Sequence, residues 1–297
     1  MQINPNDMTN SSEKPWQASL RLGFSDDVGV TRLTERSHCG PLRVQKPLYP
    51  EGGQVCHAII VHPPGGVVGG DQLSIAVQVQ DSARALIVTP GAAKWYKANG
   101  KTSQQTIQIE VGAKASLEWL PQETIFFDNA QVRLSQAVSL APDASYLACD
   151  ILCFGRSASG ERFRTGKITQ SIKIRRAGQL IWVEQGSLRG GSAAMSSVLG
   201  LADHTVCASL IAVSKTGPAA LTSTQLTSLR DEAQALLEQA GVAAVSQFGV
   251  TQIKTVIVVR FLGDASEIAR QLMLLAWRHL RPVVIGREAV ELRIWNT

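Results

Sequence analysis

Hydrophobic and polar residues alternate with a repeat of two along much of the first two thirds of the chain. The alternation is clearest in five segments: 16–24, 73–79, 107–111, 132–140 and 168–174. Strands that bury one face show this repeat, because successive side chains point to opposite sides of a sheet. Turn-forming residues separate the segments, as at Glu51-Gly52-Gly53, Thr89-Pro90-Gly91 and Ala177-Gly178. The pattern predicts a mainly β protein of many short strands, with few long helices before about residue 220.

Two later segments have the helical repeat instead. In residues 226–240 the apolar side chains recur at spacings of three and four, and Gly241 provides a stop signal. The second segment begins at Asp264-x-x-Glu267, a spacing typical of a capping box, and Pro282 is expected to end it. The sequence therefore predicts two α-helices in the C-terminal third.

Composition narrows the class of protein. The chain has 297 residues, and 44% hydrophobic against 18% charged residues excludes a disordered chain. Residues 1–15 are polar and predict a disordered extension rather than a secretory signal, and residues 16–297 predict a single domain. No apolar run approaches the roughly 18 residues of a membrane helix. We therefore expect a cytoplasmic protein with no membrane partner.

Charge and cysteine content argue against two further classes. The formal net charge is +5, but the basic residues are scattered and show no nucleic-acid-binding motif, so an acidic protein partner explains them equally well. The five cysteines form no CxxC pair, and an odd number in a chain without a secretory signal is not typical of a disulfide framework. Neither nucleic-acid binding nor a cysteine-based metal cage is expected.

The segment 62–71, HPPGGVVGGD, is the most unusual stretch of the chain. A phosphate-binding loop needs a helix directly after the glycines, whereas residues 73–79 are strand-like. This favours a tight crossing of the backbone. An enzyme or a ligand-binding protein that uses this loop stays open as the alternative function.

Three carboxylates fall in phase with apolar stripes of predicted strands. They are Asp71, Asp150 and Glu184. A buried charge is costly unless it is paired, hydrated or bound to a metal. Each acid therefore either lies at a strand end or pairs with a buried arginine, or the three line a polar channel inside the β structure. Oxygen ligands along such a channel suit the weak passage of a divalent cation.

Several motifs, in consistent order, resemble the urease accessory protein UreD (UreH) family. They are GPLRVQKPLYPEG (40–52), HPPGGVVGGD (62–71), TPGAAK (89–94), LEWLPQE (117–123), Gly155-Arg156 with Ser159-Gly160-Glu161, and Arg293-Ile294-Trp295. The first and second helical segments and the many strands agree with that family's fold, a helix-like stack of sheets with two helices.

The resemblance implies a scaffold and not an enzyme. Proteins of this family bind UreF, which recruits the GTPase UreG, and the assembly docks on apo-urease and helps to deliver nickel. No tightly bound cofactor is implied, only nickel in transit. Asp71, Asp150 and Glu184 stand in matching segments, so the resemblance implies that they line a transient nickel path.

Overall fold

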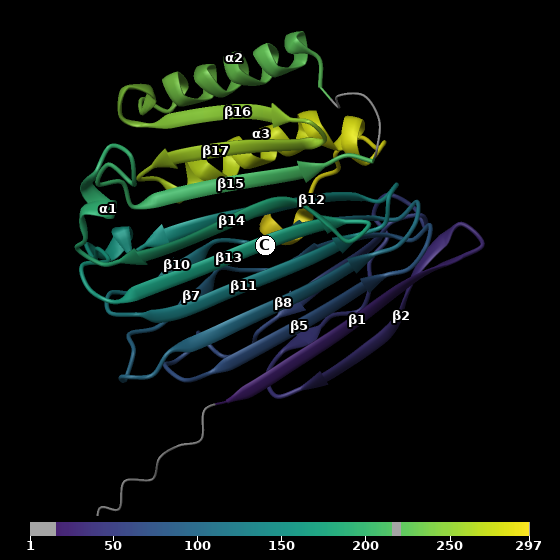
Figure 1. Cartoon of the computed structure of the whole chain (residues 1–297), viewed down its shortest axis with the longest axis horizontal. Coiled ribbons are helices and arrows are strands. Elements are labelled where there is room, and N and C mark those ends of the chain that lie inside the picture. Colours follow the sequence, from purple (N-terminus) through teal and green to yellow (C-terminus); the bar gives the residue numbers. More distant parts are fainter. Residues whose placement is uncertain (1–15, 216–220, 297) are drawn as a thin grey trace, which may run out of the picture.

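Two β-sheets face each other, and strands along the chain tend to alternate between them (Figure 1). The structure, a computed structural model, describes residues 16–215 and 221–296, so the predicted extension over residues 1–15 lies outside it. The first sheet has the strand order β14-β13-β11-β8-β5-β1-β2. Its strands are β1 (Gln17–Asp27), β2 (Val30–Cys39), β5 (Gln72–Val79), β8 (Ser103–Val111), β11 (Gln131–Leu140), β13 (Lys167–Arg176) and β14 (Gln179–Arg189).

The second sheet has the order β16-β17-β15-β12-β9-β6-β4-β3, with β10 paired to both β12 and β7. Its strands are β3 (Arg43–Val44), β4 (Cys56–Val61), β6 (Arg84–Val88), β7 (Ala93–Trp95), β9 (Ser116–Leu120), β10 (Thr124–Phe126), β12 (Ser145–Phe154), β15 (Val206–Val213), β16 (Gln247–Ile253) and β17 (Val256–Gly263). The mainly β fold predicted from the two-residue repeat is confirmed.

Parallel pairing stacks equivalent strands on one another. β1, β5, β8, β11 and β13 are parallel neighbours, as are β4, β6, β9 and β12. The register aligns one inward-facing row across five strands: Leu22, Val77, Ile109, Val138 and Ile174, all at most 2% exposed. Burying each such side chain contributes about 1.5–3 kcal/mol, so these rows hold the two sheets together. The helix-like stack of sheets is thus also confirmed.

Helices cover the outer face of the second sheet. The α-helices are α1 (Ala193–Ser196), α2 (Ser223–Gln239) and α3 (Ser266–Val284), and the 3-10 helices are η1 (Ser157–Ser159), η2 (Ala243–Val245) and η3 (Arg293–Asn296). Leu272, Trp277 and Leu280 of α3 pack in a second core with Leu210 and Val259 of the sheet. The two predicted helices are confirmed. No helix in the described ranges is long and apolar enough to cross a membrane.

The predicted capping box of the last helix is wrong. Ala265 is the N-cap of α3 and makes no side-chain cap, because the Asp264 carboxylate instead accepts hydrogen bonds from the Thr205 backbone N–H (2.9 Å) and hydroxyl (3.0 Å). A capping box does form at α2, where the Gln225 N–H donates to the Thr222 hydroxyl and the Gln225 side chain accepts from the Thr222 N–H. A tertiary partner for Asp264 thus outcompeted the local cap.

The predicted end of that helix also differs slightly. Pro282 lies inside α3, which continues to Val284. A proline lacks one backbone donor, but in the final turn only one helical hydrogen bond is lost. The helix ends instead near Gly286, which has a φ of 78°.

Candidate functional site

Asp150 lies in β12 and points into the space between the two sheets. Tyr146 and Phe154, which have the same phase on the strand, belong to the core between the sheets. The Asp150 Oδ2 atom accepts a hydrogen bond of 3.4 Å from Nε2 of Gln170, on β13 in the facing sheet. Burial, together with the negative charge of Glu184, raises the pKa of Asp150 to about 7. This carboxyl group therefore exchanges its proton near neutral pH.

Glu184 enters the same space from β14, the edge strand of the first sheet. Its Oε1 atom accepts a hydrogen bond of 3.0 Å from Nη1 of Arg260 on β17. Its Oε2 atom is buried and has no hydrogen-bond partner among the described residues. One oxygen of the Glu184 carboxylate therefore has no hydrogen-bond donor among the described residues, and a second acid, Asp150, lines the same cavity.

The two acids share a small cavity between the sheets. Asp150 and Glu184 both line a space of about 50 Å³, whose wall also includes Ser209 of β15. A larger cavity of about 240 Å³ adjoins it, since Asp150, Gln136 and Gln170 line both. The two cavities are therefore neighbours, and the Asp150 carboxyl group and the side-chain amides of Gln136 and Gln170 form part of the wall of both.

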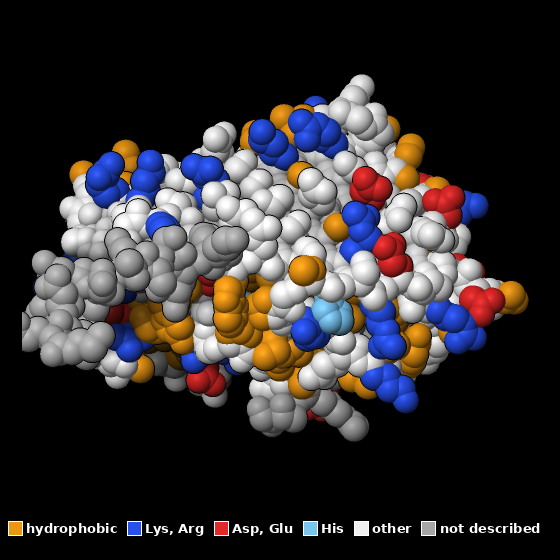
Figure 2. Space-filling model, turned by 90° about the horizontal axis from the view of Figure 1, so that it is seen from below, with side chains coloured by type: hydrophobic (Ala, Val, Ile, Leu, Met, Phe, Trp, Pro, Cys, Tyr) orange, Lys and Arg blue, Asp and Glu red, His pale blue; other side chains and the backbone are white. Residues whose placement is uncertain are grey.

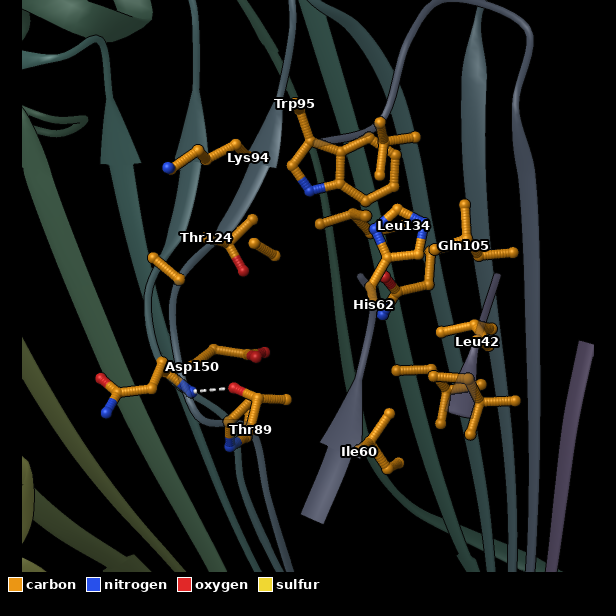
Figure 3. Close-up of a pocket in the computed structure, with 18 of the residues that line it drawn as sticks. Leu42, Ile60, His62, Thr89, Lys94, Trp95, Gln105, Thr124, Leu134 and Asp150 are labelled. Atoms are coloured by element: carbon orange, nitrogen blue, oxygen red, sulfur yellow. Dashed lines mark hydrogen bonds between the residues drawn. The ribbon is translucent and has the colours of Figure 1, made fainter. Parts of the chain in front are cut away.

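The larger cavity is mostly apolar, and a few polar groups point into it. Figure 3 shows Asp150 and Thr124 on one side of the cavity and His62 on the other, with Trp95 beyond the histidine. Burial lowers the pKa of His62, and the negative charge of Asp71 offsets part of that effect. A neutral imidazole offers one ring nitrogen as an acceptor or a metal ligand.

Asp71 does not join the other two acids. It is 5% exposed, and its Oδ1 and Oδ2 atoms accept hydrogen bonds from the backbone N–H groups of Trp16 (3.1 Å) and Val68 (3.0 Å). It lines neither of the two cavities, and it reaches the larger one only through its charge on His62. The sequence thus placed three acids on apolar stripes, and the structure brings two of them together.

This arrangement suits weak binding of a hard or borderline cation. Carboxylate and amide oxygens are ligands for divalent metals, but a closed site needs four or more well-placed donors. Across the described residues, no group of three or more His, Cys, Asp or Glu side chains is arranged to hold a metal ion.

A second buried ionic cluster was missed by the sequence analysis. Arg281 of α3 is 0% exposed, and its Nε atom donates to both oxygens of Glu118 at 3.0 Å. Its Nη2 atom donates to Glu51 at 2.6 Å, and His57 contacts the same carboxylate at 2.7 Å. The indole of Trp277 donates to Glu118 at 2.6 Å. The signal was readable, because Glu118 and Arg281 also stand among apolar residues of LEWLPQE and of the last helix.

The charges of this cluster compensate each other. Burial alone would raise the pKa of Glu51, but hydrogen bonds from His57 and Arg281 lower it to about 2. The cluster joins α3 to β9 and to the segment before β4, so its role is to fix the helix on the sheet. In this cluster opposite charges attract, whereas the two acids of the cavity, Asp150 and Glu184, repel one another.

Apolar side chains also gather on the surface at the end of the sheets opposite α2. Figure 2 shows them from that side, around a histidine and beside several Lys and Arg side chains. Trp16, Leu48 and Val68, which lie in the segments next to β1, β3 and β5, are exposed by 57%, 48% and 47%. Exposed apolar groups of this kind are typical of surfaces that bind other proteins.

Two stacked sheets that enclose an apolar core, with two acids lining a cavity inside it, define a β-solenoid-like scaffold. A sequence profile described as "UreD urease accessory protein" matches residues 17–296, nearly the whole chain. The chain belongs to the UreD family of urease accessory proteins. An accessory protein of urease is not itself the enzyme.

Curated relatives support the same assignment. A "Urease accessory protein UreD" of Janthinobacterium sp. (strain Marseille) is 58% identical over 281 residues, which cover 95% of this chain and 92% of that protein. Proteins of the same description from Nitrosospira multiformis and Methylobacillus flagellatus are 50% and 44% identical. The matches cover 97% and 96% of this chain, and 100% and 96% of those proteins.

Proposed function

We propose that this chain is a urease maturation factor that helps to deliver nickel to the active site of apo-urease. It acts as a scaffold: it binds UreF, which recruits the GTPase UreG, and the assembly docks on apo-urease. The observation that carries the nickel path is the pair Asp150 and Glu184, which face the same cavity between the sheets. Membership of the family supports the wider role.

The proposed path uses weak ligands. Nickel would contact the Asp150 and Glu184 carboxylates and the amide oxygen of Gln170, with water completing its coordination. Few protein ligands favour release, since a cage of cysteine and histidine would hold a late first-row metal strongly. The uncompensated Oε2 atom of Glu184 is the atom best placed to gain from a cation.

Proton exchange accompanies this passage. A carboxyl group with a pKa of about 7 is partly protonated in a neutral cell, and a metal ion displaces that proton. Nickel entering beside Asp150 would therefore release up to one proton, and its departure would take one up. Passage should weaken as the pH falls below 7.

Partners and compartment follow from the same proposal. The exposed apolar end of the sheets is a surface suited to one of the protein partners. We place the complex in the cytoplasm, where its five cysteines would stay reduced.

The test compares nickel delivery by two variants in cells that lack the native gene. The double variant Asp150→Asn with Glu184→Gln removes both charges and keeps side-chain size. The expected result is urease with less nickel and proportionally less activity, while UreF still co-purifies with the variant. Glu110→Gln, on the exposed outer face of β8, is the matched control.

Asp71→Asn is measured beside them, because its place on the path is a separate prediction. If Asp71 guides nickel, this variant lowers the nickel content of urease by more than its loss of folded protein accounts for, a loss expected because the asparagine NH2 group would face one of the two backbone N–H donors. Normal nickel loading by the Asp150 and Glu184 double variant would contradict the path. If UreF does not co-purify with the wild-type chain, the scaffold role is contradicted.

A further inference from the structure

The first sheet ends at β14, whereas the facing sheet continues for further strands. Beyond the free edge of β14, the second sheet extends through β17 and β16, with α3 behind them (Figure 1). The ion pair between Glu184 and Arg260 joins β14 to β17 and places this edge over that part of the second sheet. We call this step the β14 ledge: the free edge of β14 (Gln179–Arg189) and the open face of β16 and β17.

The backbone of β14 is unpaired along this edge. The strand pairs with β13 on one side, and no strand in the described part of the chain pairs with its other side. In an antiparallel pair every second residue directs its N–H and C=O away from the partner. An 11-residue strand therefore offers about five donor and acceptor pairs to an added strand.

The floor of the ledge is partly apolar, and it is exposed along β16, whereas Val256 and Val258 of β17 are buried. Ile253 and Thr251 of β16 pair with Val256 and Val258 of β17, which face the first sheet, so all four share that face. Ile253 is 51% exposed. A Cβ atom added to Gly249 on the same face would meet nothing within 4 Å. An extended segment added beside β14 would lie over this floor.

The two edges of the first sheet differ in their charges. β2 carries Arg32, Glu35 and Arg36 on exposed positions, and charged side chains are a common defence of an edge strand. β14 has no lysine or proline, and its only charges are the inward Glu184 and Arg189 at its last position. A long edge with so few outward charges is suited to pairing with another chain.

Charge defines the kind of chain that fits. β11, β13 and β14 carry a single acid, the inward Glu184, and several outward cations: Arg133, Lys167, Lys173, Arg175 and Arg189. None of these cations forms an ion pair with a residue that the structure describes. A second copy of this chain would bring two such sets together, which like-charge repulsion disfavours.

We propose that the β14 ledge binds an extended, acidic segment of a partner protein, which adds to β14 as a further strand of the first sheet. Main-chain hydrogen bonds would supply affinity, as in other cases of strand addition, and carboxylates on the outward face would meet the cations of β13 and β14. Inward side chains of the segment would cover Ile253 and the space beside Gly249. The proposal does not depend on nickel.

The test uses the full chain and a 12-residue peptide of alternating Glu and Val, with a Lys and Val peptide as the matched probe. Binding is followed by fluorescence anisotropy and by hydrogen exchange of the backbone amides. We expect the acidic peptide to bind, to lose affinity with added salt, and to slow exchange in residues 179–189. The basic peptide should not bind.

Variants locate the binding site. Gly249→Tyr fills the floor beside Arg260 and should abolish binding, because a tyrosine suits a strand and its Cβ atom would meet nothing within 4 Å. Lys173→Glu with Arg189→Glu should weaken binding roughly tenfold. Arg36→Glu on β2, a single charge reversal away from the ledge, should leave affinity unchanged, so Lys173→Glu and Arg189→Glu are also measured one at a time against it. All of these variants should keep the wild-type melting temperature.

Three results would overturn the proposal. One is equal binding of the acidic and basic peptides. Another is binding that leaves exchange in residues 179–189 unchanged or survives Gly249→Tyr. The third is a concentration-dependent dimer that protects β14 without peptide, which would assign the ledge to a second copy of the chain.

Discussion

Replacing Asp150 by asparagine should stabilise the protein at alkaline pH and do little in acid. The carboxyl group lies between the sheets, and burial and the charge of Glu184 raise its pKa from 3.8 to about 7. Asparagine has nearly the same size, and its carbonyl oxygen can still accept the hydrogen bond from Gln170. The substitution therefore removes a charge and little else.

The magnitude follows from linkage between protonation and folding. Because the folded-state pKa is the higher one, ionisation of Asp150 destabilises the fold, and this cost grows from about pH 4 to pH 7 and is constant above. At about 1.4 kcal/mol for each pH unit between 3.8 and 7, the cost reaches about 4 kcal/mol at pH 8. At pH 5 it is less than half as large. The gain at pH 8 corresponds to roughly 8 °C in melting temperature, at about 2 °C per kcal/mol for a chain of this size.

Thermal unfolding of the wild type and of Asp150→Asn at pH 5 and pH 8 measures this difference. Glu110→Gln serves as the control for loss of a surface charge and should shift neither curve. Equal melting temperatures of the wild type and Asp150→Asn at pH 8 would show that the carboxylate is hydrated or paired, and would refute the reasoning. A gain of the same size at both pH values would assign the effect to packing instead.

The other predictions concern stability. Arg281→Met leaves Glu118 buried without its positively charged partner, although the Trp277 indole still donates to it, and should lower the free energy of unfolding by about 3–5 kcal/mol, measured by urea denaturation. An unchanged midpoint would contradict the role of this cluster. Thr222→Ala removes the α2 cap and should cost about 1 kcal/mol, whereas Glu267→Ala in α3 should cost less than about 0.5 kcal/mol. The reverse order would contradict the assignment of the capping box.

The two-residue repeat predicted the strands, but it does not predict which strands pair with one another. The sequence pattern around an inward-facing residue such as Val77 is the same whether its strand pairs with the next strand in a hairpin or with a strand 32 residues later. Here Val77 pairs in parallel with Ile109, since the intervening strands β6 and β7 belong to the facing sheet. Local patterns carry the phase of a strand, and long-range packing decides its partner.

The glycine-rich segment 62–71 shows where a local interpretation succeeded. The sequence favoured a tight backbone crossing over a phosphate loop, and the segment does lead into strand β5. A Cβ atom on Gly66 would lie 2.7 Å from the Tyr96 ring, and one on Gly69 would lie 2.4 Å from the Asn99 side chain. Close packing against neighbouring segments thus explains at least these two glycines.

Strand phase predicted burial at the three acids, but it held no information about what each carboxylate would meet. Asp71 is buried, as its phase requires, and two backbone N–H groups satisfy it. Those donors belong to Trp16 and to a loop, so no periodicity could reveal them. Asp150 and Glu184 meet because β12 and β14 lie in facing sheets, a relation fixed only when the stack forms.

One energetic difference separates the functional candidate from the structural cluster. Glu118 and Arg281 are opposite charges joined by hydrogen bonds, so each compensates the burial of the other. Asp150 and Glu184 are like charges, and one carboxylate oxygen of Glu184 has no partner among the described residues. An apolar or amide residue in place of Asp150 would relieve that repulsion, so stability alone does not account for the acid. A cation between the two carboxylates would turn the repulsion into attraction, and this is the physical reason to place the proposed nickel passage there.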